Sequence, residues 1–199
     1  KIDFKPGNML YPLPAVLVSV RDGEGHDNLL TIAWTGTVCT NPPMAYISVR
    51  PSRYSYDMIK ETGEFAINLT TEDLSFATDY CGVVSGRDVD KFEKCGLHKV
   101  EADEISAPLL VESPVNIECR VKEIHEYGSH TMFVADVLCV HADEAYMNDK
   151  GKFELEGVVF AMCVVDEDIL LGDTIFTYLD NLQAETFLYE SELAVLTED

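Results

Sequence analysis

Residues 28–55 read NLLTIAWTGTVCTNPPMAYISVRPSRYS, and this stretch is the one that decides the fold class. Residues 29–38 and 44–49 are rich in β-branched and aromatic side chains, so each segment predicts a strand. The Asn41-Pro42-Pro43 run breaks the chain between them, because proline cannot donate to a strand ladder and restricts the residue before it. Over residues 52–62 the hydrophobic period becomes helical, which predicts a short helix with Ser52 or Ser55 as N-cap and Gly63 as C-cap.

Outward from this stretch the chain continues mostly as strands. The composition predicts strands at residues 15–20, 65–69, 115–124 and 131–140, a helix running from Thr70 or Thr71 to Gly82, and a polar loop over 83–114. Antiparallel strands with two inserted helices argue against a parallel doubly wound sheet. We therefore expect a mainly β fold with short helices (α+β), built as a barrel or a sandwich.

The charge of the chain excludes several classes of partner. The 199 residues include 14 Lys+Arg against 36 Asp+Glu, which gives a formal net charge of −22. Nucleic acids and anionic membrane surfaces both need a basic protein face, so neither is expected as a partner. No apolar run approaches the ~20 residues that span a bilayer. Six cysteines without a CxxC spacing favour free thiols in a reducing compartment, so we expect a cytoplasmic protein.

The common catalytic and metal-binding motifs are absent. No GxGxxG or GxxxxGK run supports a dinucleotide or P-loop site, and neither HExxH nor GxSxG occurs. Cys139 and His141 share one face of a predicted strand and are the nearest approach to a pair of metal ligands. Two ligands do not make a site, so a structural role is favoured and no metal is expected.

The segment RPSRYS, residues 50–55, has the composition of a phosphate-binding loop. It contains two of the five arginines of the chain, three hydroxyl side chains and the start of a predicted helix, whose first amides carry N–H donors and a positive dipole. The alternative is ordinary helix capping beside surface arginines. Upstream, the small residues of 35–37 would let a flat ring approach the backbone, although an ordinary barrel strand fits them equally well.

Several short motifs occur in a fixed order and together resemble a known family. They are Asn28, TxAW at 31–34, NPP at 41–43, RPSRYS at 50–55, GEFAINL at 63–69, DKF at 90–92, ESP at 112–114, ECR at 118–120 and GSHTMFVADV at 128–137. This set resembles the flavin reductase-like, FMN-binding split-barrel family and, within it, the flavoredoxin-like branch. The resemblance covers about residues 8–142.

The resemblance implies an architecture and a set of site residues. The fold would be a six-stranded antiparallel Greek-key barrel over residues 1–152, usually a homodimer with FMN at or near the subunit interface. An acidic extension, 153–199, would pack on the barrel or on the partner subunit. His130 would face the flavin as the catalytic candidate. The cofactor-binding residues would be Arg50, Ser52, Arg53, Tyr54 and Ser55 at the phosphate, Trp34, Thr35, Gly36, Thr37 and Cys39 at the ring, with Asn28, Asn68 and Lys91 nearby.

The same resemblance implies an oxidoreductase that passes hydride from NADH or NADPH to flavin N5. A second hypothesis is a flavoredoxin-type carrier that holds FMN tightly and exchanges electrons with a redox protein, and a third is a barrel that has lost its flavin. Two departures stand out: Ala135 replaces the usual glycine, and Leu171-Gly172 is a poor match to the family's closing segment. An apolar stripe at residues 182, 186, 189, 193 and 196 predicts a terminal helix, either packed on a partner or solvated.

Overall fold

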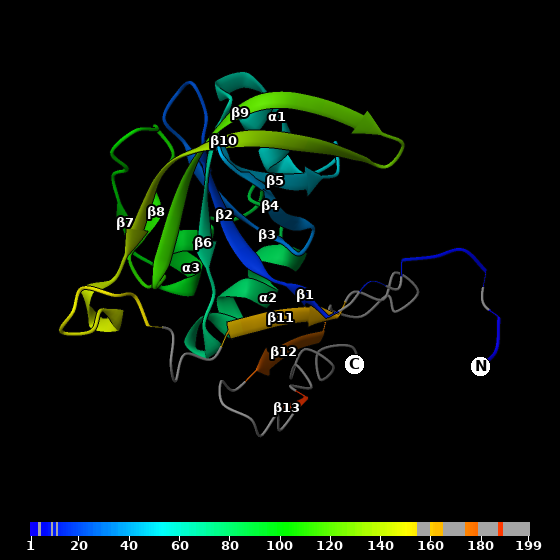
Figure 1. Cartoon of the computed structure of the whole chain (residues 1–199). Helices are drawn as coiled ribbons and strands as arrows, with labels where there is room; N and C mark the ends of the chain where they lie inside the picture. Colours follow the sequence, from blue (N-terminus) through cyan, green and yellow to red (C-terminus); the bar gives the residue numbers. More distant parts are fainter. Residues whose placement is uncertain are drawn as a thin grey trace, which may run out of the picture.

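The structure is a computed structural model that describes residues 1–154 except 4, 9 and 11, together with residues 160–164, 174–178 and 187–188. Its elements are laid out in Figure 1. The helices are α1 (Tyr54–Thr62), α2 (Ser75–Val83) and α3 (Lys91–Cys95), with 3-10 turns η1 (Glu72–Leu74) and η2 (Glu144–Tyr146). The strands are β1 (Leu13–Pro14), β2 (Val16–Arg21), β3 (Asp27–Ile32), β4 (Thr35–Thr40), β5 (Pro43–Val49), β6 (Glu64–Leu69), β7 (Lys99–Val100), β8 (Leu109–Leu110), β9 (Val115–Tyr127), β10 (His130–Ala142), β11 (Phe160–Val164), β12 (Thr174–Tyr178) and β13 (Phe187–Leu188).

The main sheet has seven strands in the order β3-β2-β6-β9-β10-β5-β4, and all neighbouring pairs are antiparallel. The expected mainly β, antiparallel fold is confirmed. The seventh strand arises because the predicted strand 29–38 bends at Ala33 and Trp34, so that its two halves, β3 and β4, lie at opposite ends of the sheet order. The two ends of the sheet order are joined by the chain itself at this bend, and the backbone N–H of Ser48 on β5 donates to the carbonyl of Trp34 at 2.9 Å, which continues the β4–β5 ladder up to the bend.

The interior of the barrel is apolar and is plugged by one helix. Side chains of alternating strand positions, such as Val18, Ile47 and Phe133, are buried there together. Met58 and Ile59 of α1 belong to the same cluster. The predicted helix and its C-cap are confirmed, since Gly63 ends α1 with a φ of 69°.

Two further apolar clusters cover the outside of the barrel. Leu17 and Leu29 on β2 and β3 pack against α2 and α3. Ala66 on β6 packs against Ile105 and its neighbours in the loop between β7 and β8. The predicted polar loop 83–114 is therefore wrong in part, because it contains α3 and this loop, which seals one outer face of the sheet.

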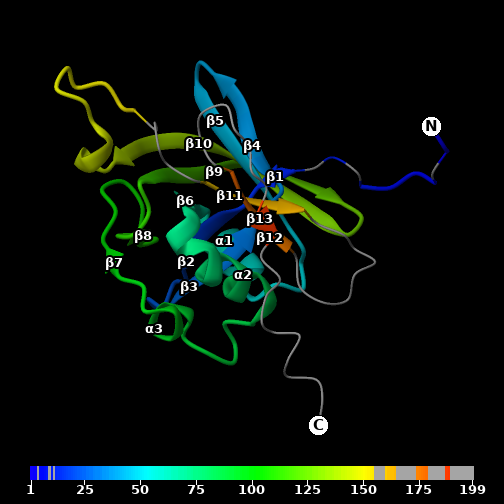
Figure 2. The same cartoon turned by 90° about the horizontal axis from the view of Figure 1, so that it is seen from below.

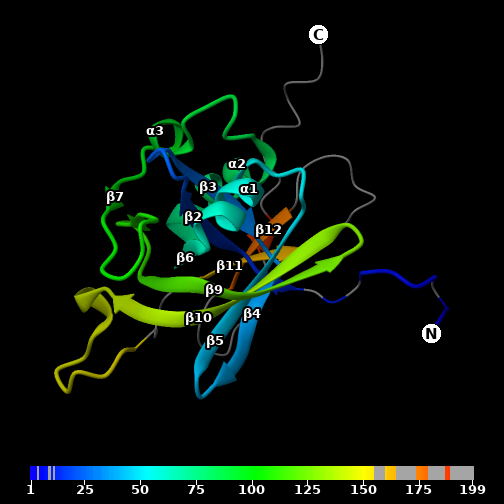
Figure 3. The ribbon, with the colours of Figure 1, turned by 90° about the horizontal axis from the view of Figure 1, so that it is seen from above.

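Two hairpins project from the barrel. Figures 2 and 3 show the β4–β5 hairpin running away from the body of the molecule, and Figure 1 shows the tip of the β9–β10 hairpin doing the same. In the described part of the chain, no helix is long and apolar enough to cross a membrane.

The chain returns to the barrel after residue 154 as a second sheet in the order β1-β11-β12-β13. In this sheet β11 pairs antiparallel with β1. The predicted helix over 182–196 is wrong at residues 187–188, which form β13, while the five residues of its apolar stripe lie outside the described residues. Leu171 and Gly172 also lie outside them. The boundary at residue 152 and the packing of the extension stay predictions.

Candidate functional site

A cleft of about 550 Å³ lies where the barrel closes. Its walls come from β3 and the bend after it, the segment that leads into α1, the end of α2 and the loop 84–87. Nine of the fourteen predicted site residues line it: Asn28, Trp34, Arg50, Ser52, Arg53, Tyr54, Ser55, Lys91 and His130.

Arginines gather at this cleft in an otherwise acidic protein. Of the five in the sequence, Arg50, Arg53 and Arg87 line the cleft. The other two lie elsewhere, Arg21 bonded to Asp27 and Glu101, and Arg120 bonded to Glu64. Three arginines that line one hollow suit an anion, because the fixed N–H donors of a guanidinium group match phosphate geometry.

Arg87 was not predicted as a site residue. Its guanidinium carbon lies 5.2 Å from the centre of the Tyr54 ring, and its Nη1 donates to the carbonyl of Ser52 at 3.4 Å. These contacts bring the loop after α2 against the segment that starts α1. The signal in the sequence was the rarity of arginine, which singles out Arg87 as well as the pair in RPSRYS.

The N-terminus of α1 faces this arginine cluster without a side-chain cap. Arg53 is the N-cap residue, with extended backbone angles and no hydrogen bond from its side chain to the helix. The prediction of Ser52 or Ser55 as N-cap is therefore wrong, since the chain enters the helix between them. A helix N-terminus lacking such a cap has N–H donors and a positive dipole for an anion, which favours the phosphate interpretation over ordinary capping.

A buried polar contact braces the middle of the cleft. The Nδ2 of Asn28 donates to the Oγ of Ser55 at 2.7 Å, and both residues are buried. Gly86 lies directly against this pair, because a Cβ at that position would stand 2.1 Å from the Oδ1 of Asn28. Only glycine fits there, so the loop 84–87 approaches the wall of the cleft as closely as its backbone allows.

Lys91 supplies a further cation at the base of the cleft. It is 4% exposed, and its Nζ donates to the carbonyls of Leu29 and Cys81, each at 2.8 Å. Burial lowers the pKa of Lys91, and the positive charge of Arg53 lowers it further. These bonds use two of the three N–H donors of the ammonium group.

Trp34 and His130 also line the cleft, and their ring centroids lie 4.3 Å apart with 36° between the planes. Nδ1 of His130 is 2.9 Å from Oγ of Ser129. Apolar side chains of Ile32 and Val49 continue the lining. An apolar wall with aromatic rings, together with a cationic anchor, suits a flat ring that carries an anionic tail.

Four of the predicted ring-binding residues lie beyond the bend, on β4. There, Oγ1 of Thr35 donates to the carbonyl of Tyr46 at 2.8 Å, and Sγ of Cys39 donates to that of Pro42 at 2.7 Å. Gly36 lies against the ring of Tyr46, and Thr37 is exposed. None of these four is among the described residues that line the cleft.

Asn68 is the fifth predicted residue that does not line the cleft. It is fully buried on β6, and its Nδ2 donates to the carbonyl of Leu17 at 2.9 Å and to Ser19 Oγ at 3.0 Å. Its Oδ1 accepts from the backbone N–H of Leu110 and from Nδ2 of Asn116. The two donated and two accepted hydrogen bonds of this amide are thus all made to groups inside the fold.

Comparison with known proteins agrees with this fold. Residues 9–157 match the model of the flavin reductase like domain. An uncharacterised protein of Archaeoglobus fulgidus is 32% identical over 152 residues, which cover 76% of this chain and 85% of that protein. The flavoredoxin of Methanosarcina acetivorans is similar in structure, with a TM-score of 0.79, 27% identity, and coverage of 98% of this chain and 100% of that one. For the flavoredoxin of Desulfovibrio vulgaris (Miyazaki F) the TM-score is 0.76, with 26% identity and coverage of 97% and 95%. On these grounds the protein belongs to the flavin reductase-like family and is a flavin-related oxidoreductase.

Proposed function

We propose that this protein binds FMN in the cleft and reduces it with NADH or NADPH. The observation that carries the proposal is the convergence of Arg50, Arg53 and Arg87 on the N-terminus of α1, at one end of a partly apolar cleft. A flavin mononucleotide presents the matching pair of groups, a dianionic phosphate and a flat ring.

The residues of the cleft divide by chemistry. Arg50 and Arg53 bind the phosphate, together with the hydroxyls of Ser52 and Ser55 and the first amides of α1. Trp34 would line the side of the cleft that takes the ring, and His130 would supply a hydrogen-bonding nitrogen there. Bound FMN would supply the redox chemistry, the uptake of hydride from the nicotinamide. The protein binds and orients, which agrees with the lack of any acid–base or nucleophile motif in the sequence.

The alternative is an electron carrier that holds FMN and exchanges electrons with a basic redox protein. Two observations favour it: the likeness to two flavoredoxins over nearly the whole chain, and the net charge of −22. An acidic surface steers a basic partner toward it, and salt screens that attraction. Electron transfer to such a partner should slow as ionic strength rises, and a rate insensitive to salt would contradict this alternative.

The visible absorption spectrum of the purified protein, followed by anaerobic addition of NADH or NADPH, separates the hypotheses. Flavin bands that bleach promptly support the reductase. Bands that persist support the carrier. A protein that stays colourless after FMN is supplied would contradict both and support a barrel without flavin.

Arginine variants test the phosphate assignment directly. A hydrogen bond to a charged group contributes about 1.5–3 kcal/mol, so Arg50→Ala and Arg53→Ala should each weaken FMN binding about 10–100-fold. Arg120→Ala is the matched control, because Arg120 bonds Glu64 and the carbonyl of Glu104, away from the cleft. Unchanged FMN affinity in the double arginine variant would overturn the assignment.

We also propose, on the resemblance alone, that the protein is a cytoplasmic homodimer with FMN near the interface. Sedimentation of the FMN-loaded protein tests the assembly. A monomer at micromolar concentration would contradict it.

A further inference from the structure

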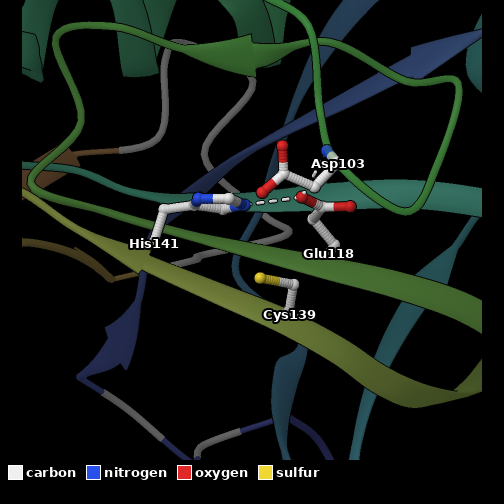
Figure 4. Close-up of side chains that lie close together, drawn as sticks. All are labelled: Asp103, Glu118, Cys139 and His141. Carbon is white, nitrogen blue, oxygen red and sulfur yellow. Dashed lines mark hydrogen bonds and ion pairs between the residues drawn. The ribbon is translucent and has the colours of Figure 1, made fainter.

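A second cluster of reactive side chains lies on the outer face of the sheet, away from the cleft. It consists of Asp103, Glu118, Cys139 and His141, whose carboxylate, thiol and imidazole ligand atoms all lie within 4.8 Å of one another. Figure 4 shows the four side chains pointing toward a common centre. None of them is among the described residues that line the cleft.

A β-bulge creates the cluster. Along β10, Val137 pairs with Cys119, yet Cys139 pairs with Glu118, so the register shifts between them. Val137 packs into the barrel interior, and regular alternation would send Cys139 and His141 to that same side. The extra residue of the bulge turns both to the outer face, where Glu118 lies.

Glu118 is the buried centre of the cluster. It is fully buried, and its Oε1 accepts from the backbone N–H of Asp103 at 2.9 Å and faces the Nε2 of His141 at 2.6 Å. Its Oε2 accepts from the backbone N–H of Glu104 at 2.7 Å. These donors lower the pKa of Glu118 although burial opposes ionisation, so the buried group is a carboxylate at neutral pH.

The carboxylates of Asp103 and Glu118 give the cluster a surplus of negative charge, which a divalent ion would balance. A thiol that coordinates such an ion is deprotonated outright, so Cys139 would add a thiolate to the ligand set.

We propose that Asp103, Glu118, Cys139 and His141 form a binding site for a borderline-soft divalent metal ion, with Zn²⁺ as the best match. One thiolate, one imidazole and two carboxylates are four ligands of the types that Zn²⁺ takes in a tetrahedral site. Ligand atoms held ~2.0–2.3 Å from Zn²⁺ in a tetrahedron lie roughly 3.3–3.8 Å from one another. The widest pairs of the cluster, up to 4.8 Å apart, would therefore approach, while Nε2 of His141 and Oε1 of Glu118, now 2.6 Å apart, would separate.

Metal binding forms a Zn–S bond and releases the Cys139 proton to solvent. His141 binds through Nε2, the nitrogen that faces Glu118 at 2.6 Å, so the proton that Nε2 donates to that carboxylate must leave it: in a neutral imidazole it moves to Nδ1 through solvent, and from an imidazolium it is released to solvent. Four protein ligands leave no open position, which is the pattern of a structural site. The ion would fasten the loop that carries Asp103 to the β9–β10 pair.

Cobalt substitution gives the direct test. The full chain, freed of metal with a chelator, should bind one equivalent of Co²⁺ and show the near-ultraviolet thiolate-to-cobalt band and the intense visible bands of tetrahedral cobalt. Zn²⁺ should displace it and release protons. No thiolate band, or no more than adventitious cobalt in the wild-type chain, would overturn the proposal.

Two pairs of variants locate the site. Cys139→Ser should abolish the thiolate band, whereas Cys39→Ser, a half-buried thiol on β4, should keep it. Loss of a residue that only hydrogen-bonds a metal ligand weakens metal binding about 10–100-fold. His141→Gln removes a ligand itself, so it should weaken Zn²⁺ binding by more than that. His125→Gln is its control, because His125 also pairs with a glutamate, Glu123, at 2.8 Å. A band that survives Cys139→Ser, or that disappears with Cys39→Ser, would contradict the assignment, and circular dichroism checks that each variant is folded. Because bound flavin absorbs in the same range, each cobalt spectrum is recorded as a difference against the same protein sample without cobalt.

Discussion

Replacing Gly86 with alanine probes how tightly the loop after α2 is pressed against the cleft. The added Cβ would lie 2.1 Å from Oδ1, 2.7 Å from Cγ and 3.0 Å from Nδ2 of Asn28. That amide cannot move cheaply, because Asn28 is 4% exposed and its Nδ2 holds Ser55 at 2.7 Å.

The cost follows from these contacts. Rotating the amide away leaves a buried polar group unsatisfied, at about 1–3 kcal/mol, and overpacking adds a similar amount. Alanine also lowers the conformational entropy of the unfolded chain relative to glycine, which offsets about 0.4–1 kcal/mol of this loss. We expect a net loss of roughly 3 kcal/mol, which for a chain of this size is about 6–12 °C in Tm.

A double-mutant cycle in urea provides the assay. In the Asn28→Ala background the new methyl group enters the space left by the amide, so Gly86→Ala should cost almost nothing and the coupling free energy should be about 2–4 kcal/mol. Gly7→Ala, where the nearest atom to a Cβ is 3.9 Å away, is the control and should change stability by less than about 0.5 kcal/mol. Equal costs in both backgrounds would refute the reasoning, as would a harmless Gly86→Ala in the wild-type chain.

Three further predictions concern stability and binding. Burial acts to raise the pKa of Asp27, but hydrogen bonds from two cations outweigh it and the net shift is downward. Ionised Asp27 stabilises the fold fully above the unfolded pKa of about 4, and this stabilisation is lost as the pH falls through the lower folded pKa. Asp27→Asn should therefore lower the free energy of unfolding at pH 7 but change it little at pH values well below about 4, as measured by denaturant unfolding. Trp34 is the single tryptophan, so its emission should be quenched in step with FMN binding; unchanged emission at saturation, as judged by equilibrium dialysis, would place the flavin elsewhere. Asn68→Leu leaves the N–H of Leu110 without its acceptor and should lower the free energy of unfolding by about 1–3 kcal/mol. If the variant binds FMN as tightly as the wild type, Asn68 does not belong to the cofactor site.

The strands were predictable where local composition decides the structure. Residues 15–20, 44–49 and 65–69 are β-branched or apolar runs bounded by turn signals, and they form β2, β5 and β6 with shifts of one residue. The bend at Ala33 and Trp34 has no such signal, since neither residue is glycine or proline. The bend is defined by the pairing of its two sides, β3 with β2 and β4 with β5, and these partner strands cannot be read from the composition around the bend.

The part of the cleft formed by residues 50–55 was predictable, because arginine is rare in this chain. Two arginines within RPSRYS are conspicuous in an acidic chain, and both line the cleft. Arg87 was missed because only the folded chain brings it to Tyr54. The cluster of Asp103, Glu118, Cys139 and His141 shows the same limit. Strict alternation along β10 would send Cys139 to the barrel interior, and only the bulge, which the sequence does not signal, brings it to the face of Glu118.

One residue links the β4–β5 ladder to the occupancy of the cleft. Trp34 lies in the bend between β3 and β4, and its carbonyl accepts the hydrogen bond from Ser48 that ends the ladder there, while the residue also lines the cleft. Local opening of the ladder at this bend must therefore disturb the wall of the cleft, and a bound ligand must oppose that opening by mass action. The amide hydrogen of Ser48 becomes a reporter for the whole arrangement: its exchange with deuterium should slow in proportion to ligand saturation, while amides at the tip of the β9–β10 hairpin exchange at an unchanged rate.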